Sequence, residues 1–300
     1  MKAMFAIRSG RRPLATVCLL AALLPSAHAM EALNDQALSS VQGRDGMSFD
    51  LSNFALTSNA RITYYTPGPS PSSLTLSNLS ASRSDDPTLP FADPFRLDIR
   101  RSEAGLADFL ELAFPINASG NVRWQAALDW NVNANGISQD GGSVVLKDAA
   151  LLGGGIQLTT PRSGDGFAWG LALGAEIGNL IFRPRGRDDV TQADPAGVAE
   201  QMNMRGIRIG AVDANGNLTR SPWRIADVST QPGILRAEAD ASGTPRLRLG
   251  IDWPGSAGAP AGGMSIDNIS FKSDMTGNLD LGSSRIGSMQ IQYLDIRFRP

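Results

Sequence analysis

The chain has 300 residues, of which 42% are hydrophobic and 19% are charged, and its formal net charge is −2 at neutral pH. Apolar residues recur with a period of two over much of the chain, which excludes disorder throughout. Basic residues are scattered along the chain and are slightly outnumbered by acidic ones, so we expect no nucleic-acid partner.

The first 29 residues have the layout of a secretory signal peptide. Four basic residues precede an apolar run from Leu14 to Leu24, and a small-x-small cleavage site ends at Ala29. The apolar run is about half of the roughly 20 residues that span a bilayer, which favours a cleaved leader over a membrane anchor. We therefore expect residues 1–29 to be removed and the protein to be exported to the periplasm, the outer membrane or the cell surface.

Cleavage after Ala29 would remove Cys18 and His28, the only cysteine and the only histidine in the sequence. The mature chain would then lack the side chains of Ser-His-Asp and Cys-His catalysis and of His- or Cys-ligated metal sites. Paired carboxylates are the main catalytic arrangement left open, and adjacent pairs occur at Asp85-Asp86 and Asp188-Asp189. Such adjacency is ordinary in proline-rich loops, so we expect no enzyme activity, no cofactor and no metal site.

The spacing of apolar residues changes from helix-like to strand-like soon after the predicted signal peptide. Residues 30–45 predict a short helix, because apolar residues recur at helical spacing and Gly43 follows them as a stop signal. From residue 46 onward, apolar and polar residues alternate as in β-strands. We expect residues 46–300 to form a single large β domain.

The clearest alternation lies in two arms, Phe109–Ile116 and Val122–Val132, joined by a turn at Asn117–Asn121. Matching alternation and a short turn predict an antiparallel hairpin with one dry face. Further hairpin turns are predicted at Asn215-Gly216 and Ser242-Gly243.

Two irregularities interrupt the alternation elsewhere. Gly153-Gly154-Gly155 predicts a corner between two short strands within Val144–Thr159. Near the C-terminal end the alternation slips by one residue at Tyr293-Leu294, which predicts a β-bulge.

Large and very small residues alternate along one predicted strand. Phe167, Trp169, Leu171 and Leu173 form its large apolar face, whereas the opposite face carries only alanine and glycine. Bare faces of this kind occur where another sheet or a ligand comes close, and also in the strands of membrane barrels. We interpret the large face as a candidate surface for an apolar ligand, with close sheet packing as the alternative.

An irregular segment rich in both signs of charge follows. It begins with Arg183, Arg185 and Arg187, which precede Asp188 and Asp189. Loops of this kind often carry recognition, so these five residues form a candidate recognition loop, and a solvated run of charges is the alternative.

The stretch Met30–Gly46 carries a distinctive pattern, Met-x-Ala-Leu-x-Asp-x-x-Leu-Ser-x-Val-x-Gly-x-Asp-Gly. This pattern resembles the start of mature exported proteins in a poorly characterised Gram-negative family associated with a pilus system of the Fil type. The family usually has Gln after the glycine that corresponds to Gly43, and this chain has Arg44. The resemblance implies a surface or pilus-associated role and carries over no catalytic residue.

Together these features predict an all-β fold of mostly antiparallel strands, in two packed sheets or in one elongated curved sheet, after one short N-terminal helix. A β-solenoid and an outer-membrane β-barrel are the alternative folds. We expect a non-enzymatic exported protein that acts with protein partners in assembly or adhesion, at the cell surface or in a pilus. An outer-membrane β-barrel and a periplasmic carrier of a hydrophobic ligand are the alternative functions.

Overall fold

The computed structural model describes residues 46–66, 72–88, 93–102, 107–184, 200–239, 241–253, 258–273 and 277–298. All of them belong to one compact unit, Arg44–Pro300. The predicted leader and the predicted helix of residues 30–45 lie outside the described residues.

The described part of the chain forms one 16-stranded sheet whose pairings are all antiparallel, which confirms the all-β prediction. Its strands, in chain order, are β1 (Met47–Phe49), β2 (Ala55–Ser58), β3 (Ile62–Tyr65), β4 (Ser73–Arg83), β5 (Phe95–Arg100), β6 (Phe109–Ala113), β7 (Trp124–Ala134), β8 (Ile137–Thr159), β9 (Phe167–Arg183), β10 (Gln201–Ala211), β11 (Trp223–Ala226), β12 (Gly233–Ala239), β13 (Pro245–Asp252), β14 (Gly262–Ser273), β15 (Gly277–Met289) and β16 (Tyr293–Phe298).

The hairpin of β8 and β9 is the centre of the sheet. These strands have 23 and 17 residues, and they pair with each other from Ser143–Arg183 to Thr159–Ala168. On its other edge β8 pairs first with β7 and then with β6, while β9 pairs in turn with β12, β11 and β10. Because each strand is long enough for several partners on one edge, the sheet branches around the hairpin.

The change of partner on β8 coincides with a bulge between Leu151 and Gly154. Gly153 and Gly154 have φ angles of 75° and 90°, in the left-handed region that favours glycine. A Cβ atom at Gly154 would lie 2.2 Å from the carbonyl oxygen of Ala172 on β9. The glycines therefore do not separate two short strands, as the sequence predicted, but shift the register of one long strand.

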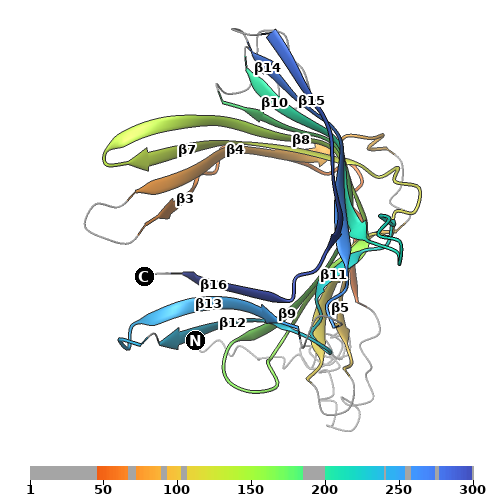
Figure 1. Cartoon of the computed structure of the whole chain (residues 1–300), viewed down its shortest axis with the longest axis vertical. Coiled ribbons are helices and arrows are strands. Elements are labelled where there is room, and N and C mark those ends of the chain that lie inside the picture. The colour runs from red at the N-terminus through yellow and green to blue at the C-terminus, as the bar shows by residue number, and fades with distance from the viewer. Residues whose placement is uncertain are drawn as a thin grey trace, which may run out of the picture. The chain divides into compact units, whose positions relative to one another are not determined.

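Four groups of strands extend from the central hairpin, and Figure 1 shows how the sheet bends between them. In the first group, β7 pairs with β4, and the other edge of β4 pairs with β2 and β3. In the second group, β6 pairs with β5, and β5 pairs with β1. In the third group, β10 pairs with β14, and β14 pairs with β15. In the fourth group, β12 pairs with β13, and β13 pairs with β16. Within the described residues, the sheet is open and is not closed into a barrel.

The sheet is a single curved layer. Strands in extensive contact are hydrogen-bonded neighbours, except that β11 also touches β10 and β14. Of the two arrangements that the sequence allowed, the elongated curved sheet is the one found.

The predicted hairpin of residues 109–132 is wrong. Its turn exists, since the Gly120 N–H donates to the Asn117 carbonyl at 2.7 Å, but its two arms do not pair with each other. Strand β6 pairs with the second half of β8 and β7 with the first half, because one long strand offers both arms an edge.

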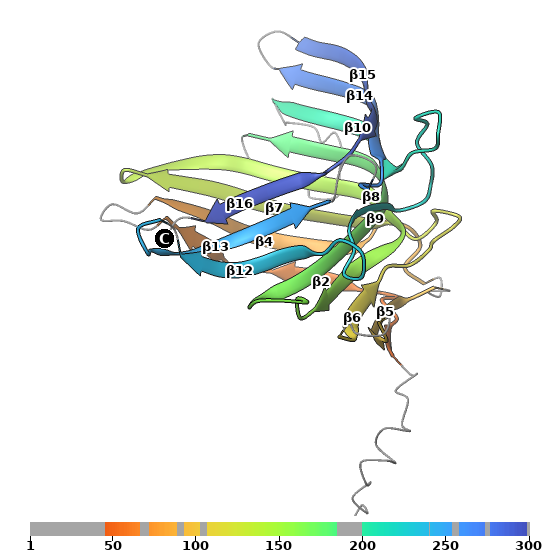
Figure 2. The same ribbon diagram turned by 60° about the horizontal axis from the view of Figure 1, so that its bottom comes forward.

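The phase slip near the C-terminal end is also not a bulge. Strand β15 ends at Met289, and β16 begins at Tyr293 and pairs with β13. Figure 2 shows β16 lying along β13 rather than along β15, so the slip marks a crossing between two branches. The turn at Ser242-Gly243 does join an antiparallel pair, β12 and β13, as predicted.

Two small clusters of buried apolar residues stabilise the sheet. Ala127, Val145 and Ile181 pack together on neighbouring strands β7, β8 and β9. The second cluster contains Ala226, Ile251, Trp253 and Ala259, with Trp169, Ile225, Ile291 and Leu294 packed against it.

We expect Ile181→Ala to lower the free energy of unfolding by about 2–5 kcal/mol, because its side chain is fully buried and the substitution leaves a cavity. The matched control is Ile137→Ala, at a residue of β8 that is 63% exposed, with an expected change below about 0.5 kcal/mol. Urea unfolding followed by circular dichroism measures both. Equal destabilisation by the two variants would contradict the assignment of Ile181 to the core.

Candidate functional site: uncovered apolar faces of the sheet

The apolar residues that the sequence singled out on β9 belong to a much wider surface. Strand register places Leu171 beside Ile156, which lies beside Leu112 on the next strand. It likewise places Phe167 beside Leu235, which lies beside Leu249. Because paired residues of antiparallel strands point to the same side, these side chains form continuous rows. We call this surface the Trp169 face: Met47, Leu97, Ile99, Leu110, Leu112, Ile156, Leu158, Phe167, Trp169, Leu171, Leu235, Leu249 and Ile296.

The Trp169 face is largely open to solvent in the structure. Ile99, Phe167 and Met47 are 68%, 64% and 60% exposed, and Leu110 and Leu158 are also exposed. Trp169 is partly buried, since it packs against the cluster around Ile251. A contiguous apolar surface of this kind marks a site of interaction with a protein, a membrane or an apolar ligand.

The opposite, bare side of β9 is covered by the chain itself. Ala168 is 1% exposed. A Cβ atom at Gly170 would lie 3.2 Å from the backbone nitrogen of Val228, and one at Gly174 would lie 3.4 Å from Cα of Pro222. The close approach that the small residues predicted is thus made by the segment around residues 222–228.

Leu173 has different surroundings from the other three predicted residues. It is partly buried, and it pairs with Gly154 on β8 and with Trp223 on β11. The structure therefore brings Phe167, Trp169 and Leu171 onto the Trp169 face, and it places Leu173 beside β11.

A second apolar face lies around the other half of the hairpin, and sequence reasoning missed it. One row crosses six strands from Leu128 on β7 through Phe182 on β9 to Leu279 on β15. The same face extends through β4 to β3, where Ile62 and Tyr64 are 56% and 58% exposed. We call this surface the Trp130 face: Ile62, Tyr64, Leu74, Leu76, Leu128, Trp130, Val132, Val144, Leu146, Leu180, Phe182, Met202, Met204, Ile269, Phe271 and Leu279.

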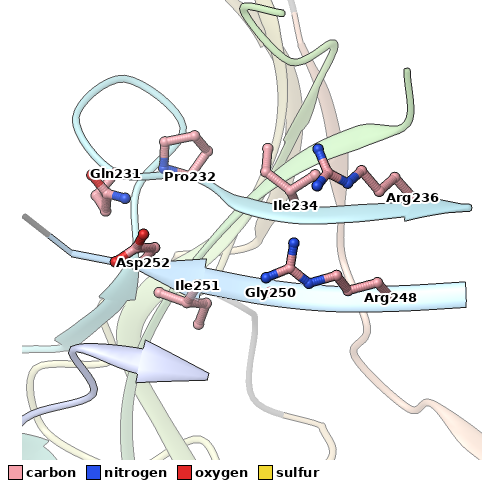
Figure 3. A pocket seen from close by; sticks show the side chains of 8 residues that line it. All are labelled: Gln231, Pro232, Ile234, Arg236, Arg248, Gly250, Ile251 and Asp252. Carbon is pink, nitrogen blue, oxygen red and sulfur yellow. The ribbon is translucent and has the colours of Figure 1, made fainter. Parts of the chain in front are cut away.

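Charged residues occupy the other side of β12, β13 and β16. Arg236, Arg248 and Arg297 are direct cross-strand partners, and Figure 3 shows the first two beside a hollow of about 230 Å³. Like charges directly opposite each other are destabilising, so this row requires carboxylates. Glu238 lies 3.3 Å from Arg236 and 3.6 Å from Arg248, and Asp295 lies 3.0 Å from both Arg248 and Arg297.

Asp295 is the acid most affected by this network. Hydrogen bonds from Arg297 and Arg248 lower the pKa of its carboxyl group from 3.8 to about 2, and the Tyr293 hydroxyl donates a further bond at 3.1 Å. In return, the hydrogen bond to Asp295 raises the pKa of Arg248. The network holds the three arginines close together through shared carboxylates.

The candidate recognition loop is only partly described. Arg183 is the last residue of β9, is 1% exposed, and donates from Nε to Oε1 of Gln201 at 3.4 Å. Arg185, Arg187, Asp188 and Asp189 lie outside the described residues.

The carboxylate pair Asp85-Asp86 has two separate structural roles. Asp85 receives hydrogen bonds of 2.9 and 2.5 Å from the buried guanidinium of Arg83, and this pairing raises the pKa of Arg83. Asp86 accepts bonds from the backbone and hydroxyl of Thr88, which lower its pKa. The partner pair Asp188-Asp189 lies outside the described residues.

Comparison with protein-family models, with curated proteins and with solved structures found no significant match. Within the described ranges, no three or more His, Cys, Asp or Glu residues are grouped so that they could hold a metal ion. The same ranges contain no helix of the length and apolarity needed to cross a membrane.

We expect Asp295→Asn to reduce the acid sensitivity of the fold. The pKa of Asp295 is lower in the folded protein than its ordinary value, so the carboxylate stabilises the fold above that ordinary value, and this contribution is lost as the pH falls from about 4 to about 2. The wild type should therefore lose more stability over this range than the variant, as measured by urea midpoints at a series of pH values. Asp165→Asn, at an exposed loop residue, is the control, and a wild-type and variant profile of the same shape would refute the role of Asp295.

Proposed function

We propose that this protein is a non-enzymatic exported component of a cell-surface or pilus-associated assembly, and that protein partners cover its apolar faces. The observation that carries the proposal is the Trp169 face, whose most exposed members lie on β1, β5 and β9. A sheet with an apolar face is stable only when that face packs against another element. Since Met47, Ile99 and Phe167 remain exposed in the described chain, we infer that the partner is another polypeptide.

Three further features support an assembly role. Among the described strands, β1, β15 and β16 each pair with one neighbour only, so their other edges offer backbone donors and acceptors to a further strand, a common mode of assembly. The resemblance of Met30–Gly46 to exported proteins of a pilus system points to the same compartment. The signal-peptide layout of residues 1–29 agrees with export.

The double variant Ile99→Asp/Phe167→Asp tests this role, because it adds two charges to the most exposed part of the Trp169 face. We expect the variant to be exported and to show the circular dichroism of the wild type, but to be lost from the surface assembly and to reduce cell adhesion. Surface labelling, electron microscopy of the cell surface and adhesion counts are the measurements. Burying a charge in a protein contact without a partner is costly, which explains the expected loss.

Tyr65→Asp/Ile116→Asp is the matched control, since these residues are 64% and 61% exposed and belong to neither apolar face. It should assemble like the wild type. Normal assembly of the Ile99/Phe167 variant would contradict the proposal that the Trp169 face is the contact with the partner polypeptide.

Carriage of a hydrophobic ligand is the second candidate function, and the row Phe167–Leu235–Leu249–Ile296 favours it because it is an apolar strip across four strands. If the protein is a carrier, native mass spectrometry of the mature chain isolated from the cell envelope should detect a bound species of lipid mass. Phe167→Asp should remove that species, and Ile137→Asp should retain it. Absence of any bound lipid in the wild type would reject carriage.

A further inference from the structure

A polar row crosses four neighbouring strands on the same side of the sheet as the Trp130 face. Glu176 on β9, Arg208 on β10, Ser265 on β14 and Arg285 on β15 are successive cross-strand partners. Directly paired residues have Cβ atoms about 4.5–5.5 Å apart and point to one side of the sheet. Ser265 therefore lies between Arg208 and Arg285 in the row.

The row forms part of the lining of a hollow of about 420 Å³. The turn between β10 and β11 contributes Asn217, Thr219 and Arg220 to its wall. Leu152 and Leu218 add apolar residues to the lining.

The hollow has an excess of cationic groups with unused donors. Arg220 pairs with Glu176 at 3.3 Å, and Arg208 pairs with Asp267 at 2.5 Å. Arg285 donates to the Gly216 carbonyl at 2.8 Å and to Asn217 Oδ1 at 3.4 Å, and no carboxylate of the described chain forms an ion pair with it. Three guanidinium groups thus meet two carboxylates.

Ser265 is the second indication of a ligand. Its Oγ atom is buried, and it has no hydrogen-bond partner among the described residues. A buried hydroxyl group without a partner is costly, so it is more stable when a ligand or water supplies one. Ser265 lies between two arginines, which favours an anionic acceptor at that position.

The hollow of Figure 3 has a different charge balance. Each of its arginines already contacts a carboxylate, Arg236 through Glu238 and Arg248 through both Glu238 and Asp295. An anion there would compete with two acids of the same network. Arg285 interacts with the carboxylate of Asp213 only at longer range and forms no ion pair with a carboxylate of the described chain, so the hollow around Ser265 is the better anion site.

We propose that the hollow around Arg208, Ser265 and Arg285 binds an acidic saccharide through its carboxylate or phosphate group. Arginine forms two parallel hydrogen bonds with either group. The volume is within the range of about 300–1,000 Å³ usual for small-molecule sites, and it exceeds what a single oxyanion fills. Asn217 and Thr219 can bond to sugar hydroxyls, while Leu152 and Leu218 can contact the apolar face of a sugar ring.

Isothermal titration calorimetry on the mature chain, residues 30–300, tests the site with glucuronate, glucose 6-phosphate and glucose. We expect at least one acidic sugar to bind about tenfold or more tightly than glucose, and the tighter acid identifies a carboxylate or a phosphate ligand. Arg208→Gln and Arg285→Gln should each weaken that binding about tenfold or more, and Ser265→Ala should weaken it less.

Arg224→Gln is the matched control, because Arg224 is 50% exposed and pairs with Asp227 just as Arg208 is 50% exposed and pairs with Asp267. It should bind like the wild type, and circular dichroism checks that all variants are folded. Equal affinity for glucose and both acidic sugars, or wild-type affinity in both Arg208→Gln and Arg285→Gln, would overturn the proposal. Because this experiment uses no partner protein, its failure would leave the assembly role unaffected.

Discussion

A β-strand has only two hydrogen-bonding edges. The whole sheet of this protein depends on how the free edges of the β8–β9 hairpin are shared among their partner strands. Strand β8 gives one edge to β6 and β7, while β9 gives one edge to β10, β11 and β12. All other branches attach through these five strands. The two buried clusters are small, so backbone pairing and cross-strand contacts contribute much of the organisation of the sheet.

The distribution of side-chain size around β9 explains why the sheet stays a single layer on the Trp169 face. Its small residues lie under the chain segment around residues 222–228, which approaches too closely for a larger side chain at Gly170. Of its large residues, Phe167 is 64% exposed, whereas Trp169 packs against the cluster around Ile251. Carboxylates and arginines occupy the other side of β12, β13 and β16, so that branch is distinctly two-sided.

Alternation in the sequence was sufficient to predict the all-β fold, the two-sidedness of β9 and the turn at Ser242-Gly243, because these are local properties. It was insufficient to predict neighbours, since alternation specifies which side a residue faces and not which strand lies beside it. Strands β6 and β7 alternate as if they were paired, yet each uses a different half of β8. For the same reason only the β9 part of the Trp169 face was predictable, and the row from Glu176 to Arg285 was not, because its members come from four separated segments.

The central position of β9 also determines the order in which the sheet can be completed. Its edge toward β8 can pair as soon as residues up to 183 are present, whereas its other edge needs residues 201–239, which come later in the chain. A nascent chain that ends between these segments therefore carries a long strand with one edge open and with Phe167 and Trp169 on its surface. Open edges and exposed apolar rows promote wrong pairing between chains. Synthesis of this protein thus includes an interval in which a chaperone that shields extended, apolar strands would be of most use.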